Sequence, residues 1–283
     1  MGTGSPFEQH PLIQAKLARG YTDYIMCPLF GRFTPNGAIA VGTKRVGGFD
    51  ENDINAIRRL QAPLARVTEA EVLYENMVTL LSTYVGRDAG EKVLNGRILR
   101  GYSENITAVI LFADLANFTA LSNVLPPEQI IATLNAYFEA LDSAIRANGG
   151  ETLKFIGDGL LAIFPTVDEV TAQTAAAMGA ISALDDARAS LAARDEGLEI
   201  AFRAALHLGD IHYGNIGSAT RLDFTAVGPA VNLTARMLQA CTELGAQTVC
   251  SEAFAPLTQS RSALARAFAF KGFDAAVMVH TLG

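Results

Sequence analysis

Two aspartates stand where apolar runs end, a position from which side chains of distant segments can meet. Asp114 follows the run ILFA, which reads as a strand, and Asp158 lies in IGDG, which reads as a tight hairpin. A helical pattern over 126–148 separates them. A strand, a helix and a hairpin in this order bring both carboxylates together across neighbouring strands. Oxygen ligands of this kind suit a hard cation, so the spacing predicts a site for one or two divalent ions.

Each acid also has a simpler interpretation. Asp114 can cap the short helix that follows it, and Asp-Gly is an ordinary turn dipeptide. The two acids favour a cation site only when they are taken together. The backbone amides of residues 115–118, at the start of that short helix, can then receive phosphate.

A second group of polar residues lies on the helix that begins at Gly228-Pro229. Asn232 and Arg236 are spaced i, i+4 and therefore project from one face of this helix. The planar donors of an arginine can reach a phosphoryl group while the asparagine orients a sugar. The alternative is an ordinary solvent-exposed helix face.

Three further residues can contact a nucleotide. Lys154 precedes Asp158 by four residues and shares its sheet face if the strand is regular, although a solvated lysine is the default interpretation. Thr225, just before the helix that carries Asn232, offers a hydroxyl group. Lys271, near the end of the chain, is a further candidate cation for binding phosphate.

The elements that must position these residues alternate between strands and helices. The first strand ends at Asp114, the helix 126–148 ends at a Gly-Gly pair, and a second long helix is predicted over 168–194. A hairpin is expected to turn at Gly209-Asp210. A helix from 229 to about 240 and two closing strands complete the pattern, which predicts an α/β sandwich on a βαββαβ core.

The first hundred residues have a different organisation. Short strands within 21–48 precede a helix that Asp50 caps, with a kink or break expected at Pro63. The run GAIAVGTKRVGGFDENDINAIRRL resembles the C-terminal half of a GAF sensor domain. The helical pattern continues to about Leu94, either as a coiled-coil connector between protomers or packed on its own domain. We therefore expect three parts: a partial GAF-like segment (1–67), a helical connector (68–100) and a catalytic domain (101–283).

Composition narrows the function classes. Of 283 residues 50% are hydrophobic and 18% are charged, which supports a substantial core. The net charge of −7 argues against non-specific binding to nucleic acid. Three cysteines without metal-ligand spacing, no apolar run of membrane-spanning length and no signal-peptide pattern lead us to expect a cytoplasmic protein.

Five motifs in order carry a family resemblance: FADLANFT, LKFIGDGLLAIF, GNIG, FTAVGPAVNLTARM and FKGF. Over about residues 101–282 the chain resembles the class III adenylyl cyclases. This resemblance implies a ferredoxin-like βαββαβ core and a head-to-tail homodimer with active sites at the interface. The segment LLSTYVGRDAGEKVLNGRILRG resembles the lead-in of bacterial members.

The resemblance also implies residue roles. Asp114 and Asp158 would hold two Mg²⁺ or Mn²⁺ ions, with the Leu115 carbonyl as a further ligand. The loop Leu115, Ala116, Asn117, Phe118 and Thr119 would hold the terminal phosphates. From the partner protomer, Lys154 and Thr225 would contact adenine, Asn232 would orient the ribose, Arg236 would stabilise charge on the α-phosphate, and Lys271 would hold the triphosphate.

The reaction implied is the conversion of ATP to 3′,5′-cyclic AMP and pyrophosphate. Lys154 with Thr225 favours ATP, since guanylyl cyclases usually carry Glu and Cys at these positions. Thr225 in place of the more common Asp is typical of a subgroup that often responds to bicarbonate. Asn117 replaces a frequent Gly, which the left-handed tolerance of asparagine can accommodate. The alternatives are a guanylate cyclase and a catalytically silent cyclase-like module that binds nucleotide and only signals.

Overall fold

The computed structural model describes residues 10–31, 35–194, 200–259 and 261–283. The chain divides into two compact units, Met1–Leu80 and Leu81–Gly283, which are described separately below. The three-part division expected from the sequence stays a prediction. None of the helices in the described ranges is long and apolar enough to cross a membrane.

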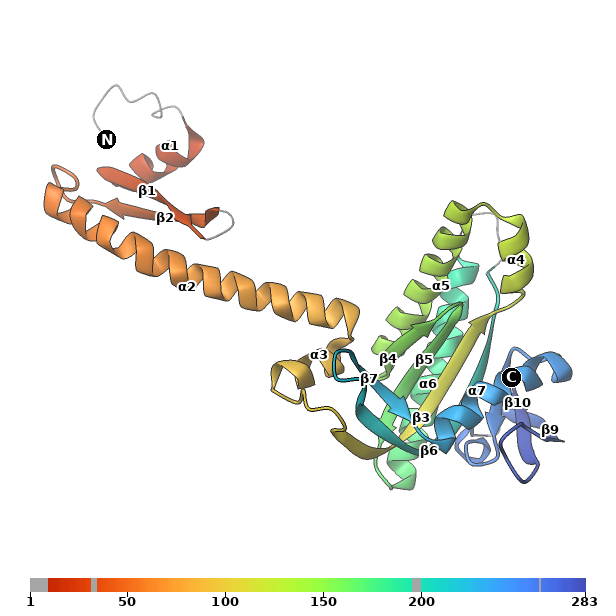
Figure 1. Cartoon of the computed structure of the whole chain (residues 1–283). Coiled ribbons are helices and arrows are strands. Elements are labelled where there is room, and N and C mark those ends of the chain that lie inside the picture. Colours follow the sequence, from red (N-terminus) through yellow and green to blue (C-terminus); the bar gives the residue numbers. More distant parts are fainter. Residues whose placement is uncertain (1–9, 32–34, 195–199, 260) are drawn as a thin grey trace. The chain divides into compact units, whose positions relative to one another are not determined.

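The first unit contains a β-hairpin and a long helix. The helix α1 (Pro11–Ala18) precedes two antiparallel strands, β1 (Asp23–Phe30) and β2 (Pro35–Thr43). The helix α2 (Glu51–Tyr84) then runs across the boundary between the units without the expected break (Figure 1). A proline interrupts a helix because it lacks one N–H, and a helix of 34 residues retains enough other bonds to continue through Pro63.

Most of α2 is unburied. Ile57 and Ala65 are buried, and the Gln61 side-chain amide donates to the Pro28 carbonyl at 2.6 Å. Large apolar residues are exposed elsewhere on this helix: Leu60, Leu64, Val67, Leu73, Tyr74, Met77, Leu80 and Tyr84. The pairing of this helix with a second copy, which the coiled-coil alternative predicts, stays a prediction.

The second unit is built on one mixed sheet, which has eight strands in the described residues. Its order is β4-β5-β3-β6-β8-β10-β9, and β7 pairs with β6. The strands are β3 (Ser103–Leu115), β4 (Glu151–Ile156), β5 (Gly159–Thr166), β6 (Phe202–Gly217), β7 (Leu222–Val227), β8 (Thr248–Ser251), β9 (Ser262–Phe268) and β10 (Val277–Leu282).

Helices connect these strands in the predicted alternation. They are α3 (Arg87–Leu94), α4 (Phe118–Val124), α5 (Pro127–Ala147), α6 (Val170–Ala192), α7 (Pro229–Leu244) and the 3₁₀ turn η1 (Ala255–Leu257). The order β3-α5-β4-β5-α6-β6, with the antiparallel strand arrangement β4-β5-β3-β6, is the ferredoxin-like βαββαβ core. The fold class predicted from the sequence is thus confirmed.

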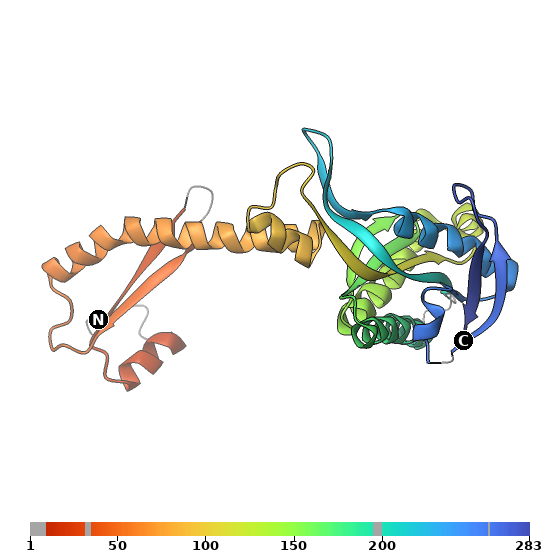
Figure 2. The same ribbon diagram turned by 90° about the horizontal axis from the view of Figure 1, so that it is seen from below.

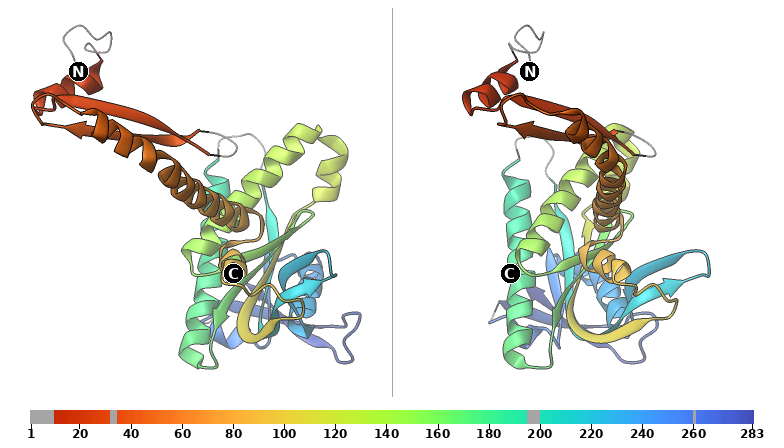
Figure 3. Two further views of the ribbon diagram at one scale, coloured as in Figure 1. Left: turned by 60° about the vertical axis from the view of Figure 1, so that its left-hand side comes forward. Right: turned by 90° about the vertical axis from the view of Figure 1, so that its left-hand side faces the viewer.

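Both faces of this sheet are covered, which explains the nearly continuous apolar run of β3. Val109 and Leu111 pack into a core with α5 and α6, whereas Ala108 and Ile110 point to the other face. Ala230, near the start of α7, belongs to that second cluster. Figures 2 and 3 show α5 and α6 together along one face of the sheet.

The hairpin expected at Gly209-Asp210 is wrong. β6 is a single strand of 16 residues, and its pairing with β3 continues without a shift from Phe202 to Gly214. Because the ladder is satisfied on both sides of Gly209, the Gly-Asp pair has no reason to turn there. The chain instead reverses beyond Gly217, where the Ser218 amide donates to the Arg221 carbonyl at 2.9 Å.

Candidate active site

The two predicted metal acids lie at the same end of neighbouring strands. Asp114 is the penultimate residue of β3 and pairs with Gly159, the first residue of β5, while Asp158 occupies the β4–β5 turn. The Leu115 amide donates to the Asp158 carbonyl at 3.4 Å, which ties the turn to β3. Gly157 has φ +64°, so this tight turn uses the left-handed conformation that favours glycine.

The carboxyl group of Asp114 is under opposing electrostatic influences. Burial raises its pKa, the charge of the nearby Asp158 raises it further, and the guanidinium of Arg203 lowers it, with a net rise above the usual range. A divalent cation would relieve both the burial cost and the repulsion between the two acids, because it supplies positive charge at the carboxylates.

Arg203 is a site residue that the sequence analysis missed. It stands directly opposite Asp114 in the β3–β6 register. Its Nε donates to Oδ1 at 3.1 Å and its Nη2 to Oδ2 at 2.9 Å, so the ion pair is bidentate. The two residues are 89 positions apart. The signal that would have located Arg203 is a charged residue within the apolar run FRAAL at the beginning of β6.

The hydroxyl of Tyr137 is the other unexpected feature beside the acids. Tyr137 lies on α5 and is fully buried, and its hydroxyl makes no hydrogen bond to the described part of the chain. Burial raises the pKa of this phenol well above its usual range, and the charges of Asp114 and Asp158 raise it further. A buried polar atom without a partner is uncommon in a folded protein, and this one lies close enough to the two carboxylates to be affected by their charge.

These residues fit a divalent cation of the hard type. No group of three or more His, Cys, Asp or Glu side chains capable of holding a metal occurs within the described residues. Two carboxylates and a backbone carbonyl are nevertheless the donor set that Mg²⁺ accepts when water or substrate phosphate supplies the remaining ligands. The unpartnered Tyr137 hydroxyl is compatible with such an ion and its water.

The loop after Asp114 contains a residue in the left-handed conformation, which asparagine tolerates. Asn117 has φ +59°, in the left-handed region, and precedes α4. The amide of Ala116 already donates to the Ala201 carbonyl at 2.9 Å, as that of Leu115 does to Asp158. Leu115 ends β3, Ala116 and Asn117 form the turn, and Phe118 and Thr119 begin α4. Because the amides of Leu115 and Ala116 already have protein partners, the phosphate contact predicted for this loop would fall mainly to Asn117 and Phe118.

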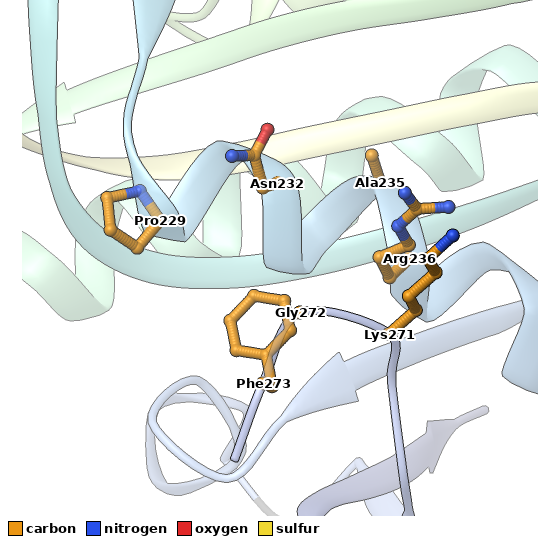
Figure 4. A pocket seen from close by; sticks show the side chains of 7 residues that line it. All are labelled: Pro229, Asn232, Ala235, Arg236, Lys271, Gly272 and Phe273. Atoms are coloured by element: carbon orange, nitrogen blue, oxygen red, sulfur yellow. The ribbon is translucent and has the colours of Figure 1, made fainter.

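The predicted phosphate and ribose donors meet in one pocket, shown in Figure 4. Asn232 and Arg236 of α7 lie on its helix side, and Lys271 enters from the segment between β9 and β10. Phe273 and Pro229 supply apolar walls to a cavity of about 470 Å³. This donor pocket has two cationic side chains and no acid among its lining residues, so it suits an anionic ligand.

Lys154 and Thr225, the predicted base-contacting residues, lie on β4 and β7. Lys154 forms an ion pair with Asp223, which lies two residues before Thr225 on β7. Thr225 is buried and pairs with Gly214 of β6. The register shift of β4 lies before Lys154, and pairing is regular from Lys154 to Ile156, where the strand ends. Because Asp158 lies in the turn beyond β4, the sheet face that Lys154 was expected to share with it stays a prediction.

Comparison with known proteins identifies the family. Residues 102–275 match the model of the adenylate and guanylate cyclase catalytic domain, which is well over half of the chain. The chain therefore belongs to this family, whose members are the class III nucleotidyl cyclases. The family binds nucleotide substrates, is generally metal-dependent and functions as dimers, in agreement with the donor pocket and the paired acids.

The similar proteins include both adenylyl and guanylyl cyclases. An adenylate cyclase of Anabaena cylindrica is 28% identical over 178 residues, which cover 60% of this chain and 36% of the relative. The chain thus spans about a third of that curated relative's length. A bacterial light-regulated adenylyl cyclase has a TM-score of 0.63 at 22% identity, covering 78% of this chain and 64% of its own. The guanylyl cyclase Cya2 has a TM-score of 0.54 at 24% identity, and the match covers 64% of this chain and 93% of Cya2.

Proposed function

We propose that this protein is an adenylate cyclase that converts ATP to 3′,5′-cyclic AMP and pyrophosphate. The observation that carries the proposal is the donor pocket, in which Asn232, Arg236 and Lys271 converge without an acid. An anionic triphosphate complements such a pocket. The carboxylate pair Asp114 and Asp158 lies outside it and supplies the complementary half of a phosphoryl-transfer site.

The reaction joins the ribose 3′-oxygen to the α-phosphorus and releases pyrophosphate. Arg236 stabilises the negative charge that develops on the α-phosphoryl oxygens, because its planar donors match them. Asn232, one turn earlier on α7, orients the ribose so that the 3′-hydroxyl faces the phosphorus. Lys271 holds the β- and γ-phosphates of the leaving group.

Asp114, Asp158 and the Leu115 carbonyl would hold two Mg²⁺ or Mn²⁺ ions. When bound, the ions would supply Lewis-acid activation of the 3′-hydroxyl and neutralise charge on the triphosphate. Asn117, Phe118 and the start of α4 would contact the terminal phosphates, with Ala116 and Thr119 completing the loop.

The active site is proposed to lie between two protomers. The donor pocket contains neither metal acid, and Asp114 lines a different pocket together with Arg203 and Thr242. Arg236 of one copy and Asp114 of another would meet if two chains pack head to tail. Each homodimer would then contain two equivalent sites.

ATP is proposed as the substrate in preference to GTP. An ammonium donor at Lys154 suits the unprotonated N1 of adenine and conflicts with the protonated N1 of guanine. The Thr225 hydroxyl can accept from the adenine amino group. Bicarbonate activation belongs to the same proposal, and an activity that stays flat across bicarbonate at fixed pH would refute it.

The first experiment incubates the full chain with ATP, and separately with GTP, in Mg²⁺ or Mn²⁺ and quantifies the cyclic nucleotides. Cyclic AMP as the main product, lost in Asp114→Ala, is the expected result. Cyclic GMP as the main product would overturn the assignment of Lys154 and Thr225. A dimer that binds ATP and forms neither product would favour the silent signalling module.

A mixing experiment tests the shared site. Asp114→Ala and Arg236→Ala are expected to be inactive alone, yet a heterodimer of the two has one site free of both substitutions. Equal amounts should therefore recover about a quarter of the wild-type activity after subunit exchange, because half of the dimers have one of two sites intact. No recovery despite confirmed exchange would contradict a site built from two protomers.

A further inference from the structure

Arg203 holds Asp114 in one orientation. Its Nε and Nη2 donate hydrogen bonds to the two carboxylate oxygens, at 3.1 and 2.9 Å. Both side chains are largely shielded from water, with 30% of Arg203 and 24% of Asp114 exposed. A bidentate pair fixes the plane of the carboxylate as well as its position, which a single hydrogen bond does not do.

The guanidinium has a second partner on α7. Its Nη1 donates to the Thr242 hydroxyl, and Thr242 lines the same pocket as Asp114 and Arg203. The guanidinium of Arg203 is therefore hydrogen-bonded on two sides, to a carboxylate of β3 and to a hydroxyl of α7. α7 is also the helix that carries Asn232 and Arg236.

The bonds to Arg203 leave Asp114 able to bind cations. An ionised carboxylate offers about four lone-pair sites, of which the two bonds to Arg203 use two. One site remains on each oxygen. Rotation of the carboxylate would break both hydrogen bonds to Arg203. The remaining lone-pair sites of Asp114 therefore keep fixed directions.

We infer that Arg203 is a positioning residue for the cation site, and that Thr242 anchors it to α7. This inference rests on the proposed function, in which Asp114 is a metal ligand. Arg203 does not touch the substrate. It orients the carboxylate for a divalent cation, and through Thr242 it links that orientation to the helix bearing the transition-state donors.

The substitution Arg203→Lys tests orientation separately from charge. Lysine keeps the positive charge, but its ammonium group cannot form a planar bidentate pair with both carboxylate oxygens of Asp114. Removal of a residue that orients a metal ligand typically costs 10- to 100-fold in affinity, so the dissociation constant for Mn²⁺ should rise by about that factor. Thr242→Val removes the hydroxyl that accepts from the Arg203 guanidinium and should raise the Mn²⁺ dissociation constant roughly threefold.

The full chain offers a matched control in Arg188. Arg188 of α6 is also partly buried and also donates to a threonine hydroxyl, that of Thr248, but it contacts neither metal acid. Arg188→Lys should leave the Mn²⁺ dissociation constant unchanged. Mn²⁺ binding to each variant is measured by electron paramagnetic resonance without nucleotide, and thermal melting confirms that each variant is folded.

A folded Arg203→Lys with wild-type Mn²⁺ affinity would overturn the inference, as would an equal loss in Arg188→Lys. Asp114→Ala in the same titration separates this inference from the proposed function. If Asp114→Ala abolishes Mn²⁺ binding and Arg203→Lys does not weaken it, only the positioning role fails. If Asp114→Ala binds Mn²⁺ normally, the metal role of Asp114 itself fails.

Discussion

Lys154 and Asp223 form an ion pair that joins β4 to β7, strands that are not hydrogen-bonded neighbours in the sheet. The residues are 69 positions apart. Asp223 lies two residues before Thr225, so the pair brings the proposed base-contacting lysine to the strand that carries the proposed base-contacting threonine.

Asp223→Asn should impair ATP binding more than turnover. Without the carboxylate, Lys154 loses the partner that directs its ammonium, so we expect the KM for ATP to rise several-fold and the preference for ATP over GTP to fall. Asp185→Asn, which breaks the exposed ion pair with Arg261, is the control and should change neither value. An unchanged KM and nucleotide preference in Asp223→Asn would show that the ion pair does not direct Lys154.

Arg236→Ala should lower kcat by a factor on the order of 10²–10³, the usual cost of one charge-stabilising donor. The KM for ATP should change less, because the proposed contact strengthens as charge develops on the α-phosphate. Steady-state kinetics with ATP measures both values. Arg146→Ala on α5, where the arginine pairs with Asp142, is the control. A kcat near the wild-type value in Arg236→Ala would contradict the assigned role.

Tyr137→Phe should leave the metal-free protein as stable as the wild type, because the hydroxyl has no hydrogen bond to lose within the described chain. We expect it to reduce the rise in melting temperature that Mn²⁺ produces, since the hydroxyl would gain a partner only in the loaded site. Tyr213→Phe removes another buried hydroxyl, which lies near Asp88 and Glu151 and not near the metal acids, and serves as the control. An identical Mn²⁺-dependent rise in Tyr137→Phe and wild type would contradict this prediction.

His207 should make the second unit less stable in mild acid. Burial lowers the pKa of His207 from 6.5 to about 4, and its Nδ1 lies 2.7 Å from the Ser251 hydroxyl. Below pH 6.5 the unfolded chain gains a proton that the folded chain accepts only near pH 4. The free energy of unfolding therefore has its full value above pH 6.5, the pKa of His207 in the unfolded chain. It falls by up to about 3 kcal/mol as the pH decreases from 6.5 to about 4.

Urea unfolding across the same pH window measures this effect. His207→Gln should flatten the pH dependence of the unfolding free energy relative to the wild type, while His280→Gln should retain it. Parallel pH profiles for wild type and His207→Gln would contradict a neutral buried histidine.

The exposed apolar side of α2 should contribute to pairing between copies. Leu60, Val67 and Tyr74 recur every seven residues and are 55%, 67% and 53% exposed, which is the spacing of a coiled-coil seam. Val67→Glu should weaken the dimer in sedimentation experiments. Arg66→Glu, at the neighbouring position, controls for the added charge. Equal dimer stability in the two variants would favour a helix packed on its own domain.

Several features follow from local sequence. The helix predicted over 126–148 is found as Pro127–Ala147, since its apolar period and its Pro and Gly boundaries are local properties. The positive φ of Asn117 agrees with the conformational tolerance expected of asparagine. The placement of Asp114 and Asp158 at adjoining strand ends follows from element order, because neighbouring antiparallel strands share an end.

Other features depend on register between distant segments. Arg203 faces Asp114, and Asp223 reaches Lys154, only because the sheet brings together residues 89 and 69 positions apart. A shift by one residue would turn each side chain to the opposite face, and no local pattern determines that register. Gly209 likewise resembles a turn residue in isolation, yet it lies within β6 because β3 supplies hydrogen bonds on both sides of it. Residue types and their order therefore predict the fold and both halves of the candidate site, whereas the partners that orient the charged side chains are decided by tertiary pairing.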